Sequence, residues 1–393
     1  MEPGQAVIVG AGIGGLTAAL ALSRRGWDVT LVERRTGFSD AGAGIQLSPN
    51  ASRILIDLGL GPAFRRVATE PGRVVIRATA SGREIGTVAL GPFMRERFGA
   101  PYFVIRRTDL QTLLLDAVRG RANVKLLMGR TVLGLNETPD KACVTIENAT
   151  GARDTLQADL AVAADGLWSR LRAAGEDWRE PEYQGFAAWR ATTPRAAAPA
   201  ELAGEETGLW LGREGHVVHY PVAGGRLLNI VAVQPRPDAV EGWAALGNPA
   251  ELLRNFAKVA PPLRDLLGAA PAWQIWSLFD LSAAAMRRGR LALLGDAAHP
   301  VLPFLAQGGA LAIEDAAVLA RALDGADDIH EALRAYERAR LPRARRVQKA
   351  ARRNAAAYHA SGLKSFLRDR IIHRLGPEHM AARYAWLYGW RPA

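Results

Sequence analysis

Four residues near the N-terminus have the types and the spacing that bind a nucleotide. Gly10, Gly12 and Gly15 form a G-x-G-x-x-G motif, and Glu33 follows 18 residues after the last glycine. The first glycine of such a motif permits a tight turn, the second lets the backbone approach a pyrophosphate, and the third lets a helix pack closely on a strand. A carboxylate at the position of Glu33 can accept hydrogen bonds from a ribose diol. These residues, with Gly14 in the same turn, predict a dinucleotide site.

The segments around this motif predict a βαβ unit that positions it. Residues 7–9 are a β-branched run typical of a buried strand, and residues 28–32 predict a second strand that ends at Glu33. Between them, residues 16–26 have the pattern of a helix that ends at Gly26. The free N–H groups at the start of that helix would face the phosphates. The alternative is a glycine-rich structural turn, which does not explain the acid at residue 33.

Composition indicates an ordinary globular protein. The chain has 393 residues, of which 49% are hydrophobic and 23% charged, so a disordered or fibrous chain is excluded and more than one domain is expected. The single cysteine, Cys143, excludes a disulfide scaffold, and we expect no metal site. The apolar segment 6–22 lacks the positive charge that precedes an export signal, and no other run reaches the ~18 apolar residues of a membrane helix. We therefore expect a cytoplasmic protein without a membrane anchor.

A net charge of +11 favours anionic partners. The most basic run, residues 338–353, alternates with Ala, Val and Leu and predicts the solvated face of a helix. The anionic partner could be a small acid, a nucleotide or a nucleic acid, but no zinc-finger or RRM pattern accompanies the charge, so we expect no nucleic acid.

Further motifs follow strand-like runs along the chain. Asp165-Gly166 comes after the run 159–164, and Gly295-Asp296 comes after the run 290–294. Other short motifs are AGIQLSPN at 43–50, IRRTDL at 105–110, AQGG at 306–309 and EDA at 314–316. The middle of the chain, residues 179–280, consists of short strand-like runs separated by turns, and it predicts an antiparallel or mixed sheet. Residues 73–90 predict a hairpin that joins this sheet.

Taken together, these motifs resemble the single-component FAD-dependent aromatic hydroxylases, the p-hydroxybenzoate hydroxylase superfamily. The nearest branch holds salicylate hydroxylase, 3-hydroxybenzoate 6-hydroxylase and 6-hydroxynicotinate 3-monooxygenase. The resemblance implies an α/β fold, with a Rossmann-like FAD-binding domain of the glutathione-reductase type, an inserted mixed β-sheet substrate domain and C-terminal helices. The expected boundaries are 1–72, 100–178 and 281–345 for the discontinuous FAD-binding domain, 73–99 and 179–280 for the sheet domain, and 346–393 for the C-terminal helical segment.

The same resemblance assigns most motif residues to FAD. Asp165 and Gly166 would lie near the pyrophosphate, and Asp296 would accept hydrogen bonds from the ribityl hydroxyls. The N–H groups of a helix that opens at 307–309 would face the N1/C2=O edge of the flavin, because a helix N-terminus stabilises negative charge. Asp165 as a helix cap, and the glycines at 308 and 309 as packing residues, are the alternatives. The full expected set is Gly10, Gly12, Gly14, Gly15, Glu33, Arg34, Gly44, Ile45, Arg107, Gln111, Asp165, Gly166, Gly295, Asp296, Pro300, Gln307, Gly308 and Gly309.

The substrate side is expected on the strand that contains HVVHY. Alternate residues of a strand share a face, so His216 and Tyr220 point one way and His219 the other. In the nicotinate-type relatives a matching His and Tyr line the substrate pocket, which implies catalytic roles for His216 and Tyr220. His216 would help to remove the phenol proton, while ordinary packing is the alternative. Pro303, Phe304 and Gln46 are expected in the pocket wall. His299 would hold its loop, and His330, His359, His373 and His379 are expected to form no cluster.

The implied activity is a monooxygenase reaction. The resemblance implies that bound FAD, with NADH or NADPH and O₂ as co-substrates, hydroxylates a small phenolic or hydroxy-aromatic acid such as salicylate through a flavin C4a-hydroperoxide. A second dinucleotide motif is missing from the sequence, which fits transient binding of NAD(P)H. The alternatives are an epoxidase or reductase of the same fold that acts on a lipid, and a non-enzymatic nucleotide- or nucleic-acid-binding protein. A monomer or homodimer is expected.

Overall fold

A six-stranded sheet forms the frame on which the glycine motif lies. The structure, a computed structural model, describes residues 2–38, 43–175, 179–240, 242, 245–324 and 326–392. The sheet has the order β18-β19-β11-β1-β2-β7, and all its pairs are parallel except β18 with β19. Its strands are β18 Arg287–Arg288, β19 Leu291–Leu293, β11 Leu160–Ala163, β1 Gln5–Val9, β2 Asp28–Glu33 and β7 Val124–Met128. The predicted βαβ unit is confirmed.

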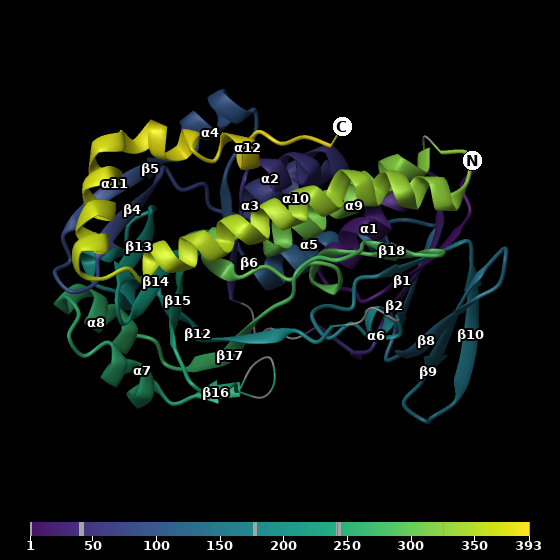
Figure 1. Cartoon of the computed structure of the whole chain (residues 1–393), viewed down its shortest axis with the longest axis horizontal. Helices are drawn as coiled ribbons and strands as arrows, with labels where there is room; N and C mark the ends of the chain where they lie inside the picture. The colour runs from purple at the N-terminus through teal and green to yellow at the C-terminus, as the bar shows by residue number, and fades with distance from the viewer. Residues whose placement is uncertain are drawn as a thin grey trace.

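Helices pack on this sheet through small residues. Helix α1 (Ile13–Ser23) follows β1 and packs against α5 (Arg107–Arg119) and α9 (Gly308–Asp324). A side chain on Gly14 would place its Cβ 2.6 Å from Leu294 Cδ2, and one on Gly15 would place it 1.9 Å from the carbonyl oxygen of Gly10. The two glycines therefore let α1 lie directly on β1 and α9. An antiparallel sheet of β8 Thr131–Glu137, β9 Ala142–Glu147 and β10 Arg153–Ala158 lies at the edge of the molecule (Figure 1).

The second large sheet has eight strands and is mixed. Its order is β16-β17-β12-β15-β14-β13-β4-β5, and only β13 with β4 is parallel. The predicted mixed sheet, with residues 73–90 as an added hairpin, is confirmed. One face packs on α7 (Pro249–Asn255) and α8 (Pro261–Gly268). The strands are β16 Ala245–Gly247, β17 Trp273–Asp280, β12 Glu182–Pro194, β15 Leu227–Pro235, β14 Gly215–Val222, β13 Thr207–Gly212, β4 Arg73–Ala78 and β5 Glu84–Ala89.

A single long helix, α10 (Ile329–Tyr358), runs from the parallel sheet to the mixed sheet (Figure 1). Helix α11 (Gly362–Ala382) then lies along β5, and α12 (Ala385–Tyr388) is the last helix of the described residues. The expected division between residues 345 and 346 falls inside α10, so the predicted C-terminal segment starts partway along a continuous helix. The expected boundary at residue 178 lies outside the described residues.

The basic run on α10 is not simply a solvated face, which corrects the prediction. Arg340 and Arg343 are buried and form ion pairs with the buried carboxylates of α9.

None of the helices in the described ranges is long and apolar enough to span a bilayer. The remaining elements are β3 Gly44–Leu47, α2 Pro49–Leu55, α3 Gly61–Val67, α4 Gly91–Phe98, β6 Phe103–Arg106 and α6 Arg170–Ala173, a π-helical turn at Ile56–Leu60, and 3-10 turns at Arg195–Ala197, Ala200–Leu202, Gly295–Ala297 and Pro303–Leu305.

Candidate active site

Two adjoining cavities lie between the parallel sheet and the mixed sheet. The nucleotide cavity, of about 500 Å³, is lined by the glycine motif, Glu33 and the Asp165 loop. The sheet cavity, of about 310 Å³, is lined by residues of β14, β15 and β17 and by the segment 300–309. Both cavities share the lining residues Gly12, Arg107, Ala164, Gly166, Leu167, Arg190, Trp276 and Asp296. They therefore form one continuous trough.

The expected cofactor residues gather along this trough. Of the eighteen residues assigned to FAD from the sequence, all but Gly15 line one cavity or both. Gly15 lies behind the motif, where it packs α1 on β1. Among the expected substrate and catalytic residues, the sheet cavity is lined by His216, Tyr220, Gln46 and Pro303. Phe304 is the exception, because it packs behind His216 with ring centroids 5.2 Å apart and does not line the cavity.

The glycine motif forms an open cradle at the start of α1. Gly10 has a φ of +101°, which side chains rarely adopt, and a Cβ there would lie 2.5 Å from the carbonyl oxygen of Ala164. Gly12 is the N-cap of α1, and a Cβ there would contact nothing within 4 Å. The Glu33 carboxylate accepts hydrogen bonds from the N–H groups of Ala11 at 2.8 Å and Arg35 at 3.0 Å. It is thus held at the cavity edge with lone pairs left for a ligand.

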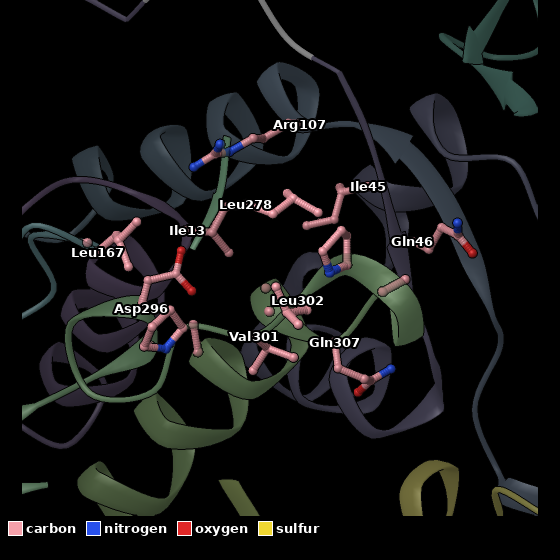
Figure 2. Close-up of a pocket in the computed structure, with 18 of the residues that line it drawn as sticks. Ile13, Ile45, Gln46, Arg107, Leu167, Leu278, Asp296, Val301, Leu302 and Gln307 are labelled. Atoms are coloured by element: carbon pink, nitrogen blue, oxygen red, sulfur yellow. The ribbon is translucent and has the colours of Figure 1, made fainter. Parts of the chain in front are cut away.

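Two opposite charges face each other across the junction of the cavities. Arg107, at the start of α5, and Asp296, in the turn after β19, come from different elements and both line the junction (Figure 2). Burial lowers the pKa of Arg107, while the charge of Asp296 opposes this shift. Burial raises the pKa of Asp296, and Arg107, His299 and Arg172 oppose that shift. Both groups are surrounded by protein yet open to the trough, which suits the binding of a polar ligand there.

The Asp165 loop serves the fold as well as the cavity. Asp165 lines the nucleotide cavity, and its Oδ2 accepts a hydrogen bond from the N–H of Arg170 at 3.0 Å. Arg170 is the first residue of α6, but the N-cap of this helix is Ser169, whose side chain accepts from the N–H of Arg172, so the alternative prediction of Asp165 as the helix cap is wrong. Burial raises the pKa of Asp165, while hydrogen bonds from Ser169 and the backbone oppose the rise.

A buried ionic cluster holds the turn that carries Asp296. Asp315 on α9 accepts hydrogen bonds from the N–H of Gly295 at 2.9 Å, from His299 Nε2 at 2.6 Å and from Arg340 Nε at 2.7 Å. Burial by itself would lower the pKa of His299, but the charge and hydrogen bond of Asp315 outweigh it and raise that pKa. The pKa of Asp315 falls to about 2, because His299 and Arg340 outweigh the effect of burial. His299 therefore holds the loop, as expected.

A second buried chain of hydrogen bonds fixes the start of α9. The side chain of Gln307 accepts from Asn50 Nδ2 at 3.0 Å and donates to Ser48 Oγ at 2.8 Å. Asn50 also donates to Glu314 at 2.6 Å. These bonds anchor the helix that begins at Gly308, whose first residues line the sheet cavity next to Ile45 and Gln307 (Figure 2).

The alternation of β14 turns His216, Val218 and Tyr220 toward the sheet cavity. His219 lies on the opposite face, beside Trp210. Tyr220 packs so closely on β3 that a Cβ at Gly44 would lie 2.4 Å from its ring. Burial raises the pKa of Tyr220, so its hydroxyl stays protonated. The expected separation of the two histidines is therefore present in the structure.

His216 has a partner that the sequence did not indicate. Its Nδ1 lies 3.1 Å from Nε2 of His359, the C-cap residue of α10. The sequence expectation for His359 concerned only a cluster with His330, His373 and His379 and did not include this pair. Burial, followed by the charge of His359, lowers the pKa of His216 well below its usual value, and burial lowers that of His359 to about 4. Both imidazoles are neutral near pH 7.

Arg190 on β12 is a further residue missed by sequence reasoning. Its guanidinium carbon lies 3.5 Å from the ring centroid of Trp276 on β17, and both residues line both cavities. Burial and the nearby Arg107 lower its pKa to about 9, so it remains a cation at pH 7. The sequence signal for this residue is that Arg190 is the one charged residue in the run FAAWRATTP. Its position at the cavities depends on how β12 pairs with β17, which the sequence does not show.

The trough fits an FAD molecule. The open space at Gly12 leaves the helix N-terminus free for a pyrophosphate, and the cations Arg107 and Arg190 stand next to it. Beyond the junction, the walls of the sheet cavity become apolar, with Val218, Leu278 and Leu302 among them. The glycine cradle, the positive junction and the apolar walls of the sheet cavity follow one another along the trough. This order suits a dinucleotide with a flat ring at one end. The fold and the site thus define a dinucleotide-binding protein whose cofactor FAD fits.

Comparison with known proteins supports FAD as the ligand of this trough. The FAD binding domain family matches residues 4–351. The 3-amino-4-hydroxybenzoate 2-monooxygenase PtnB3 of Streptomyces platensis is 38% identical over 98% of this chain and 96% of its own. The 3-hydroxybenzoate 6-hydroxylase of Klebsiella oxytoca is 33% identical over 98% of this chain and 97% of its own. Among solved structures, Klebsiella pneumoniae HpxO complexed with FAD and uric acid is 30% identical, with a TM-score of 0.84, over 96% of this chain and 95% of its own.

The chain belongs to the FAD binding domain family, and within it to the FAD-dependent aromatic hydroxylases. The resemblance drawn from the sequence motifs is confirmed, as is FAD as the cofactor.

Proposed function

We propose that this protein uses NADH or NADPH and O₂ to add one hydroxyl group to a small hydroxy-aromatic acid. The observation that carries the proposal is the sheet cavity, which adjoins the nucleotide cavity and has both apolar and polar lining residues. His216, Tyr220 and Gln46 are among its polar residues. A cavity with apolar walls and placed polar side chains is typical of a site for a small organic ligand.

The charges around the sheet cavity favour an acid as substrate. Arg190 lines it and keeps its charge at pH 7 because its pKa is about 9, whereas the charge of Arg107 is opposed there by Asp296. Bound flavin would share this cavity of about 310 Å³ with the substrate, which favours a substrate with a single ring. The named relatives act on substituted hydroxybenzoates, which are acids of this size.

The chain's own residues would bind the cofactor and orient the ring. Bound FAD, once reduced by NAD(P)H, supplies the activation of O₂ and the transfer of one oxygen atom. Arg107, Asp296 and the N-terminus of α9 would hold FAD, and the N–H groups of that helix would stabilise negative charge on the flavin. Tyr220 keeps its proton and would donate a hydrogen bond. His216, whose pKa is well below the usual value, is a weak base, so its geometry supports binding and orientation of the substrate.

The full-length similarity to ring hydroxylases favours this activity over a lipid epoxidase or a non-enzymatic role. A cytoplasmic location, a monomeric or homodimeric state and the lack of a nucleic-acid partner belong to the proposal as expectations.

A substrate panel tests the proposal. Oxidation of NADH and of NADPH, together with H₂O₂ release, would be measured with salicylate, 3-hydroxybenzoate, 3-amino-4-hydroxybenzoate, 6-hydroxynicotinate and urate. We expect at least one hydroxy-aromatic acid to be hydroxylated with little peroxide released. If every compound leaves all the reducing equivalents in H₂O₂ and no hydroxylated product forms, the proposed function is wrong.

A further inference from the structure

The contact between His216 and His359 determines which ring nitrogen of His216 carries its proton. The two imidazoles meet through Nδ1 of His216 and Nε2 of His359, and both rings are neutral near pH 7. A neutral imidazole has one N–H and one bare nitrogen. One ring must therefore donate in this hydrogen bond and the other must accept, which leaves two arrangements.

The two other nitrogens of the pair have different surroundings. Nδ1 of His359 is buried and has no hydrogen-bond partner among the described residues. His216 lines the sheet cavity, and its Nε2 is not among the buried, unpartnered atoms of the described chain, so this nitrogen faces the cavity. The partner ring is fixed by packing, since His359 stacks on Phe186 with centroids 5.0 Å apart.

The buried Nδ1 of His359 decides between the arrangements. If His216 donated, the proton of His359 would have to sit on Nδ1 and would be a buried N–H without an acceptor. Orphaned buried N–H groups are rarer in proteins than buried acceptors that lack a donor. The favoured arrangement therefore places the proton of His359 on Nε2, where it donates to Nδ1 of His216. His216 must then carry its own proton on Nε2, toward the cavity.

We propose that His359 is a positioning residue that locks His216 in the Nε2–H form, so that the substrate meets a hydrogen-bond donor at this point of the cavity. The inference rests on the proposed function for the identity of the ligand. Tyr220, on the same face of β14, also keeps its proton. Two neutral donors then face the substrate, and they select a phenolate or carboxylate oxygen, which accepts hydrogen bonds. A group that arrives as a donor finds no bare nitrogen on His216 and can be accepted only by the Tyr220 hydroxyl.

Nitrogen NMR of the FAD-loaded protein tests the proton position without any turnover. The chain has seven histidines, and protein labelled with ¹⁵N only in histidine gives ring signals whose long-range ¹H couplings distinguish the two neutral forms. The signal of His216 is assigned by its loss in His216→Gln. We expect His216 to be protonated on Nε2 in the wild type near pH 7. A His216 signal of the Nδ1–H form overturns the proposal.

Two substitutions of His359 separate positioning from packing. The amide of His359→Gln can still donate to Nδ1 of His216, whereas the carboxylate of His359→Glu has the same size and can only accept. We expect the Gln variant to keep the Nε2–H form and the Glu variant to place a proton on Nδ1 of His216. If Nδ1 of His216 stays without a proton in the Glu variant, His359 does not set the proton position and the proposal fails.

The substrate consequence is read from binding to the same variants. The ligand is the acid that gives the best-coupled turnover in the substrate panel, titrated by its effect on the flavin absorbance. His359→Glu, which leaves Nε2 of His216 as a bare acceptor toward the cavity, should weaken its binding on the order of tenfold, the loss of a hydrogen bond to a charged group, and His359→Gln should keep the wild-type affinity. Equal affinities in the two variants overturn the proposal. A chain that hydroxylates nothing would refute the proposed function, whereas the NMR result would still decide the role of His359.

Discussion

The backbone N–H of Gly295 donates a hydrogen bond of 2.9 Å to the carboxylate of Asp315, twenty residues further along the chain. Gly295 begins the turn that presents Asp296 to the cavities, and Asp315 lies fully buried on α9 between His299 and Arg340. The carboxylate thus ties the cofactor-facing turn to the helix whose N-terminus lines the sheet cavity. Stability of the fold and retention of the cofactor should therefore depend on the same residue.

Substitution Asp315→Asn should show this dependence. Breaking a buried ion pair costs about 3–5 kcal/mol of stability, because the charge of Arg340 loses part of its compensation. We expect a lower melting temperature and weaker FAD binding in the folded fraction. The matched control is Asp324→Asn on the same helix, whose ion pair with Arg25 is half exposed, and it should change stability by less than about 1 kcal/mol. An Asp315→Asn protein that binds FAD as tightly as the wild type contradicts the link.

Two glycines of one motif should respond differently to alanine. Gly12→Ala adds a methyl group in open space at the cradle, so the melting temperature of the FAD-free protein should hold while FAD affinity falls at least about tenfold, the loss of one good phosphate contact. Gly15→Ala places a Cβ 1.9 Å from the carbonyl oxygen of Gly10, so the fold itself should fail or melt early. Thermal melts of FAD-free protein and FAD titrations measure both effects. Equal effects of the two variants on stability would show that the cradle is not open.

Two acidic residues should matter for FAD retention. Glu33→Ala and Asp296→Ala each remove an acceptor for cofactor hydroxyls, and a hydrogen bond to a charged group contributes about 1.5–3 kcal/mol, or roughly ten- to hundredfold in affinity. Asp28→Ala is the control, because Asp28 starts the same strand as Glu33 but is exposed and away from both cavities. Fluorescence titration of the stripped protein with FAD gives the affinities. Unchanged affinity in both test variants would remove these residues from the cofactor site.

Local sequence patterns were sufficient for the parts of the site that lie within one motif. The turn at Gly10, the acid at the end of β2 and the helix after Gln307 are all set by short-range chemistry. The two faces of β14 also followed from alternation alone. The partners of these residues were not predictable in the same way, because they depend on the path of the chain. His359 meets His216 across 143 residues only because α10 reaches the mixed sheet.

The basic run of α10 shows the same limit. Arg340 and Arg343 look like surface residues in sequence, since lone arginines seldom lie in a core. They are buried because Glu314 and Asp315 occupy the facing side of α9. The expectation for Phe304 failed for a related reason, since the 3-10 turn at Pro303–Leu305 directs its ring behind His216.

His219 should make the fold sensitive to acid. It is fully buried, neither ring nitrogen has a described partner, and burial and then Arg77 lower its pKa from 6.5 to about 4, against the opposing charge of Glu206. As the pH falls below 6.5, His219 binds a proton in the unfolded chain before it does so in the folded protein. The contribution of neutral His219 to stability is therefore complete above pH 6.5 and is lost as the pH falls to about 4. The whole shift corresponds to about 3 kcal/mol.

Substitution His219→Leu should remove this part of the acid sensitivity. Between pH 7 and pH 5 the wild type should lose about 2 kcal/mol more of its free energy of unfolding than the variant. The control is His373→Leu on α11, an exposed position, which should keep the wild-type pH dependence. Denaturant unfolding at several pH values provides the comparison, and identical pH dependence in His219→Leu and wild type would contradict the burial of a neutral imidazole.

Transfer of one oxygen atom from O₂ to a ring is the central claim, and isotope labelling measures it directly. The purified protein with its bound FAD would be given NADH or NADPH, ¹⁸O₂ and the best acid of the panel, and the product analysed by mass spectrometry. We expect one ¹⁸O atom in each hydroxylated product and one NAD(P)H consumed per product. A product that carries its new oxygen from water would contradict the assignment. So would a protein whose reduced FAD only converts ¹⁸O₂ into labelled peroxide with every hydroxy-aromatic acid.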